Sequence, residues 1–182
     1  ILAVGRLAEA KDHQSLIEAW AKLENKYPNW QVKIFGKGPL HDSLSRRIRI
    51  LGLKRLAIFE PTSQIMQEYL DAKILAMPSK YEGFGLVTAE ALAAGLPVIG
   101  FVDCPGTNEL IIHGVNGLLA NPHGGRARGF AHELDRLIQN EALRVKLAKH
   151  APASVEKFSP DVVIDNWEEM LFKVAKVERA HG

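Results

Sequence analysis

Residues 73–101 read KILAMPSKYEGFGLVTAEALAAGLPVIGF, and this stretch decides the fold. It begins and ends with short apolar runs that suit buried strands, and between them good helix formers run from Leu86 to Ala94. Gly83 and Gly85 allow the sharp backbone turn that leads from the first strand into the helix. A strand, a helix and a second strand in this order predict two parallel strands joined by a right-handed crossover.

The alternation of strand and helix continues over the first 120 residues. Apolar runs bounded by glycine, proline or charge predict strands at Ile1–Gly5, Gln31–Phe35, Leu56–Glu60, Lys73–Met77, Pro97–Phe101 and Gly117–Ala120. The segments between most of them carry apolar side chains at helical spacing. We therefore predict an α/β fold with a Rossmann-like, doubly wound parallel sheet. Its ligands should bind in the loops at the carboxyl ends of the strands.

The last third of the chain is predicted to be helical. One helix follows the turn at 121–125, a second begins after Asn140 as its cap, and a third begins with Ser159 as cap and Pro160 in the first turn. Apolar side chains recur along this last helix at Val163, Trp167, Met170, Val174 and Val177. A stripe of this kind needs a packing partner.

Composition limits the class of protein. The chain has 182 residues, 47% of them hydrophobic, which is the size of a single packed domain at 1–182. A net charge of +2 does not argue for nucleic acid as a partner. The local basic group is interpreted as a solvated face, with anionic lipid headgroups at the inner face of a membrane as the second interpretation. Its members are Arg46, Arg47, Arg49, Lys54 and Arg55.

The single cysteine, Cys104, excludes an internal disulfide framework and favours a reducing, cytoplasmic compartment. The seven histidines lack metal-ligand spacing and fall mostly in loops or on helix surfaces, so we predict no metal site and no cofactor. The chain also starts directly on a strand-like run, Ile1–Val4. We therefore expect a fragment whose N-terminal part is absent.

Two glutamates flank the glycine turn. Glu82 precedes the predicted helix and Glu90 lies more than a turn inside it, so a regular segment separates them by roughly 12 Å along the axis. Both can face the strand ends and accept hydrogen bonds from hydroxyls at the two ends of one long ligand. In the alternative, Glu82 caps a loop and Glu90 is a solvated helix residue.

Basic side chains and free backbone N–H groups predict a phosphate site. Arg6 and Lys11 follow the first strand and can neutralise a diphosphate, although a rim arginine and a surface lysine are the alternative. The backbone at 85–87, with the helix dipole behind it, forms an anion site. The Gly-Lys-Gly-Pro stretch at 36–39 is interpreted as a tight turn that lets a ligand approach the backbone.

Taken together, these motifs resemble the C-terminal domain of retaining, two-Rossmann-domain (GT-B) glycosyltransferases of the Glu-x7-Glu type, the glycosyl transferases group 1. The likeness covers nearly the whole chain, since stretches such as Gly95-Leu-Pro-Val-Ile99 and Gly114-Val-Asn-Gly-Leu-Leu119 continue it. It implies that the chain is the donor-binding half of such an enzyme. The last helix, about 160–179, would then cross back toward the absent N-terminal acceptor domain.

The resemblance also implies roles for individual residues. Arg6 and Lys11 would hold the donor diphosphate, Glu82 would bind hydroxyls of the transferred sugar, and Glu90 would bind the ribose. The base would lie against the loop at 61–64, where Pro61 replaces the family's usual glycine. The implied catalytic set is Arg6, Lys11 and Glu82, and the implied substrate-binding set is Gly5, Gly36, Gly83, Phe84, Gly85, Leu86, Val87 and Glu90.

The implied reaction is transfer, with retention, of a hexose or N-acetylhexosamine from a UDP-sugar or GDP-sugar. The acceptor would be a saccharide or a lipid-linked molecule in cell-surface glycan synthesis. A noncatalytic nucleotide-binding module is the alternative. A glycoside hydrolase is disfavoured because Glu82 and Glu90 are expected to lie farther apart than the roughly 6.5 to 9.5 Å of inverting sites. A dehydrogenase is disfavoured because the dinucleotide fingerprint is incomplete.

Overall fold

The computed structural model describes residues 1–180, and within the last helix it describes side chains as far as Val174. Its centre is a six-stranded sheet in the order β3-β2-β1-β4-β5-β6, with every pair of neighbours parallel. The strands are β1 (Leu2–Val4), β2 (Val32–Phe35), β3 (Leu56–Phe59), β4 (Leu75–Ala76), β5 (Val98–Phe101) and β6 (Gly117–Ala120). The predicted doubly wound α/β sheet is therefore confirmed.

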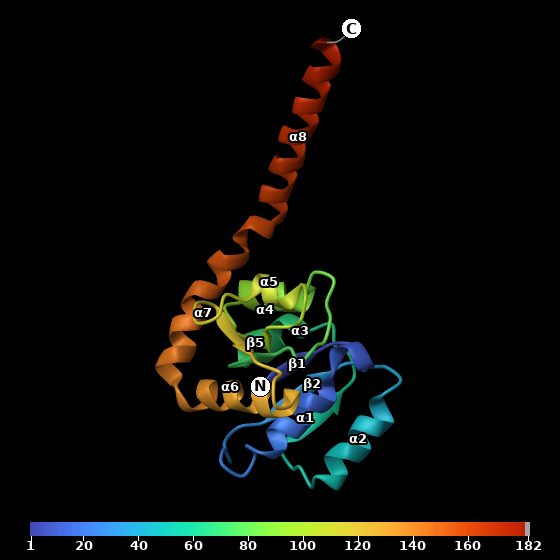
Figure 1. Ribbon diagram of the computed structural model, residues 1–182, viewed down its shortest axis with the longest axis vertical. Helices are drawn as coiled ribbons and strands as arrows, with labels where there is room; N and C mark the ends of the chain where they lie inside the picture. Colours follow the sequence, from blue (N-terminus) through green and yellow to red (C-terminus); the bar gives the residue numbers. More distant parts are fainter. Residues whose placement is uncertain (181–182) are drawn as a thin grey trace.

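Helices cover both faces of the sheet (Figure 1). They are α1 (His13–Ala21), α2 (His41–Ile50), α3 (Ile65–Asp71), α4 (Leu86–Ala93), α5 (Thr107–Leu110), α6 (Arg126–Gln139), α7 (Glu141–Val155) and α8 (Pro160–Ala180), with 3-10 turns η1 (Glu9–Lys11) and η2 (Glu156–Phe158). One core joins α1 and α6 to the sheet through Trp20 and Phe130. The opposite core uses Tyr69 of α3, Leu92 of α4 and Ala151 of α7.

Two helix starts confirm predicted caps. The side chain of Asn140 accepts a hydrogen bond from the Leu143 N–H at 2.9 Å, and α8 begins at Pro160 directly after Ser159. The short helix α5 was not predicted. It has only four residues, and a residue pattern of that length cannot show helical periodicity.

Helix α8 extends away from the body of the domain (Figure 1). Its predicted apolar stripe is exposed where the structure describes it, at Val163, Trp167, Met170 and Val174, while the side chain of Val177 lies outside the described residues. The stripe therefore has no packing partner among the described residues. Over that same part of the chain, no helix combines the length and apolar character that crossing a bilayer requires.

Candidate donor-binding site

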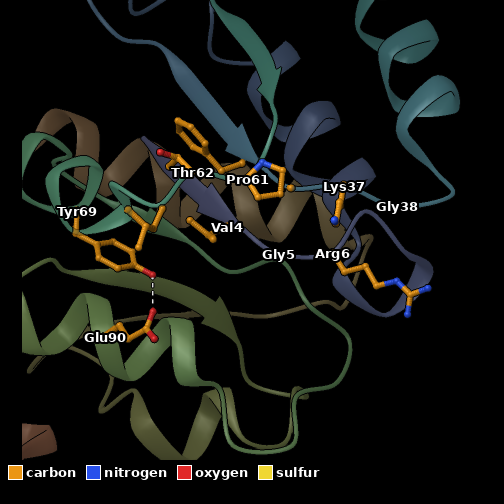
Figure 2. Close-up of a pocket in the computed structure, with 12 residues that line it drawn as sticks. Val4, Gly5, Arg6, Lys37, Gly38, Pro61, Thr62, Tyr69 and Glu90 are labelled. Carbon is orange, nitrogen blue, oxygen red and sulfur yellow. Dashed lines mark hydrogen bonds between the residues drawn. The ribbon is translucent and has the colours of Figure 1, made fainter.

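A cavity of about 800 Å³ opens at the carboxyl ends of β1, β2 and β3 (Figure 2). Its lining comprises Val4, Gly5, Arg6, Phe35, Gly36, Lys37, Gly38, Pro61, Thr62, Ile65, Tyr69 and Glu90. The strand order reverses beside it, because β1 lies between β2 and β4. This is the switch point at which open parallel sheets bind ligands. Of the predicted site residues, the cavity brings together Gly5, Arg6, Gly36 and Glu90.

Glycines make close contact possible between the loops after β1 and β2. A β-carbon on Gly36 would lie 2.0 Å from the carbonyl oxygen of Gly5, and one on Gly38 would lie 2.5 Å from that of Leu7. The Leu7 N–H donates to the Lys37 carbonyl at 3.0 Å and closes the two loops together. The Gly-Lys-Gly turn is therefore packed closely against the loop after β1, and it forms part of the cavity wall.

Glu90 faces the cavity from α4 and is oriented by Tyr69 of α3. The Tyr69 hydroxyl donates to Glu90 Oε2 at 2.9 Å, along the dashed line in Figure 2. Burial raises the pKa of Tyr69, so the phenol stays protonated and remains a donor. The other oxygen, Oε1, accepts no hydrogen bond from the residues that the structure describes. The sequence pattern places Tyr69 only on a helix face, although a buried phenol usually needs a polar partner.

Lys11 and Glu82 form an ion pair with each other. Lys11 Nζ lies 2.5 Å from Glu82 Oε2, and the Ser79 hydroxyl donates to Oε1 at 2.7 Å. The Glu82 side chain is buried, whereas Lys11 is partly exposed. The stem of Lys11 runs beside Gly5, since a β-carbon on that glycine would lie 3.6 Å from Lys11 Cδ. The pair therefore adjoins the cavity wall.

The Gly-Phe-Gly turn lies outside the lining of this cavity. Gly85 precedes α4 with a φ of 85°, a left-handed conformation that favours glycine, and no side chain in the described part of the chain caps the helix. The N-terminal backbone of α4, including Leu86 and Val87, thus lacks a side-chain cap and remains the predicted anion site. The Phe84 ring packs edge-on against Phe158, with 5.0 Å between centroids.

One histidine departs from the expected surface position. His13 is only 3% exposed because the first turn of α1 faces the core, close to Gly5. Burial lowers the pKa of His13 to about 4, so the imidazole is neutral at physiological pH. Within residues 1–180, no group of three or more histidine, cysteine or acidic side chains is arranged to hold a metal ion.

Comparison with known proteins identifies the family of this chain. The family model "Glycosyl transferases group 1" matches residues 1–154. An uncharacterized glycosyltransferase of Haemophilus influenzae is 31% identical over 172 residues, which are 94% of this chain and 48% of that protein. The chain spans half or less of the length of the first curated relatives it matches.

Two solved structures show the same architecture. The C-terminal domain of LpcC, a glycosyl transferase group 1 family protein from Francisella tularensis, is 28% identical with a TM-score of 0.75, over 85% of this chain and 83% of that one. Anabaena HepE in complex with UDP is 26% identical with a TM-score of 0.84, over 94% of this chain and 48% of that one. The chain belongs to the glycosyl transferases group 1 family, and its fold is that of the C-terminal domain of a GT-B glycosyltransferase.

Proposed function

We propose that this chain is the nucleotide-sugar-binding domain of a retaining glycosyltransferase and that it takes a UDP-sugar, with a GDP-sugar as the second candidate. The observation that carries the proposal is that one cavity is lined on one side by the backbone at 36–38 and by Arg6, and on the other by the carboxylate of Glu90, which Tyr69 holds. That arrangement suits a nucleoside diphosphate. The UDP bound to the related HepE supports the choice of uridine.

The lining of the cavity suggests where each part of the donor lies. Glu90 would accept hydrogen bonds from the ribose hydroxyls, because a carboxylate is an acceptor only. The base would lie toward Pro61 and Thr62, over the apolar side chain of Ile65. The diphosphate would extend toward Arg6, whose guanidinium can bind two phosphate oxygens at once.

The sugar would extend from the diphosphate toward Lys11 and Glu82. Arg6, Lys11 and the N-terminus of α4 would stabilise the negative charge that grows on the departing diphosphate as the sugar–phosphate bond breaks. Glu82 would accept hydrogen bonds from hydroxyls of a hexose or N-acetylhexosamine. An acceptor hydroxyl attacking from the same face would retain the configuration, and its proton would pass to the departing phosphate oxygen.

The acceptor site would lie on a domain that precedes this one. The exposed apolar stripe of α8 supports that arrangement, since Trp167 and its neighbours have no partner among the described residues. The acceptor would be a saccharide or a lipid-linked molecule. The isolated chain is then expected to bind the nucleotide without transferring sugar.

Titration calorimetry with UDP and GDP tests this proposal. We expect UDP to bind in the micromolar to millimolar range, and Arg6→Ala and Glu90→Gln each to lower the affinity about tenfold, because each removes charge-assisted hydrogen bonds. Arg128→Ala and Glu141→Gln are matched controls, since both side chains are exposed and neither lines the cavity. The proposal fails if neither nucleotide binds, or if both site variants bind as tightly as the controls.

A further inference from the structure

Arg126, the first residue of α6, connects three loops at the carboxyl edge of the sheet. Its Nε donates to Asp12 Oδ2 at 2.8 Å, after β1. Its Nη1 donates to both carboxylate oxygens of Asp103 at 3.1 Å, after β5. Its Nη2 donates to the carbonyls of Pro78 and Ser79, after β4, at 3.1 and 2.9 Å. All three guanidinium nitrogens of Arg126 therefore donate hydrogen bonds.

The guanidinium of Arg126 is held in one orientation. It lies over the ring of Phe101, with Cζ 3.7 Å from the centroid, and the side chain is 19% exposed. Its partner Asp12 is almost wholly buried. A lysine could not replace Arg126 here, because its ammonium group is neither planar nor able to donate in this forked geometry while it stacks on a ring.

The contacts of Arg126 lead directly to Lys11 and Glu82. Asp12 follows Lys11 in the chain and has a φ of 45°, the one left-handed backbone among the described residues other than glycine. Ser79, whose carbonyl accepts from Arg126, donates its own hydroxyl to Glu82 Oε1. Arg126 therefore fixes the backbone beside one member of the ion pair and the hydroxyl that holds the other.

We propose that Arg126 is a positioning residue that sets Lys11 and Glu82 in place for the diphosphate and the sugar of the donor. The proposal rests on the function proposed above. The nucleoside end is independent of Arg126, because Glu90 is held by Tyr69 from α3. Loss of Arg126 should therefore weaken binding of the diphosphate and leave binding of the nucleoside unchanged.

Comparison of UDP with uridine tests this division. We expect Arg126→Gln to lower the affinity for UDP about tenfold and to leave the affinity for uridine unchanged, both measured by NMR titration of the chain. Arg126→Lys should give the same loss of UDP affinity, because an ammonium group cannot reproduce the fork. A role confined to stability would weaken both ligands together.

A milder variant covers the case in which Arg126→Gln does not fold. Asp12→Asn keeps a side chain that tolerates the left-handed backbone and weakens one contact to Arg126, so we expect about a threefold loss for UDP and none for uridine. Equal losses for the two ligands, or none for UDP, would overturn the positioning role. If the unsubstituted chain binds uridine at least as tightly as UDP, the cavity does not bind the diphosphate. That result would contradict both the proposed function and the role of Arg126.

Discussion

Gly36→Ala is expected to lower the free energy of unfolding by about 3 kcal/mol or more. The added β-carbon would lie 2.0 Å from the carbonyl oxygen of Gly5, a backbone atom that cannot rotate away. Hydrogen bonds keep both backbone segments from moving apart. The Gly36 N–H donates to the Phe59 carbonyl oxygen, and the Gly5 N–H donates to the Phe35 carbonyl oxygen, each at 3.0 Å. Relief of the clash must therefore separate β1 from β2 at the edge that forms the cavity wall.

Gly83→Ala is the matched control for this substitution. Apart from the adjoining residues, no described residue has an atom within 4 Å of a β-carbon added at Gly83. The φ of Gly83 is not left-handed, so we expect a change of less than about 1 kcal/mol in the free energy of unfolding. Urea denaturation followed by circular dichroism measures both variants. Equal midpoints for Gly36→Ala and the unsubstituted chain would show that the two loops are not packed as described.

Lys11→Met is expected to have the second large effect, on both stability and binding. The Glu82 carboxylate is buried and would lose its only cationic partner among the described residues, which should lower the free energy of unfolding by about 3 kcal/mol. The affinity for UDP should fall about tenfold, because the proposed diphosphate site loses a positive charge. Urea denaturation and calorimetry measure the two effects separately.

The double variant Lys11→Met, Glu82→Gln separates structure from binding. Glutamine carries no charge and can still accept a hydrogen bond from Ser79, so most of the lost stability should return. The affinity for UDP should stay low, because the cation is still absent. Recovery of UDP affinity in the double variant would show that Lys11 acts only as the counterion of Glu82.

The sequence predicts most of the sheet because its signals are local. Most strands are continuous apolar runs, and β5 is buried at every residue, so its sequence shows no alternation. The exceptions are β2, which contains Lys33, and the edge strand β3, which is buried only at Leu56. The predicted ends of the strands are less accurate than their positions. Strand β4 has only two residues, whereas the predicted strand spans Lys73–Met77. A strand ends where its hydrogen bonds to the neighbouring strand end, not where the apolar residues end. Periodicity also gave no sign of α5.

Side-chain pairing in the site could not be predicted in the same way. Arg6, Gly36 and Glu90 reach one cavity because topology alone brings the strand ends together. The contact of Lys11 with Glu82 joins residues 71 positions apart, and that of Arg126 with Asp12 joins residues 114 apart. Such contacts depend on the packing of whole helices, and a polar residue at a helix start gives no sign of its distant partner.

The position of bound UDP tests the central claim most directly. A crystal structure of this chain with UDP should place the ribose hydroxyls within about 3 Å of the Glu90 carboxylate and the diphosphate between Arg6 and Lys11, with the base toward Pro61. UDP bound outside the cavity, or with its phosphates at Glu90 and its base at Arg6, would contradict the account.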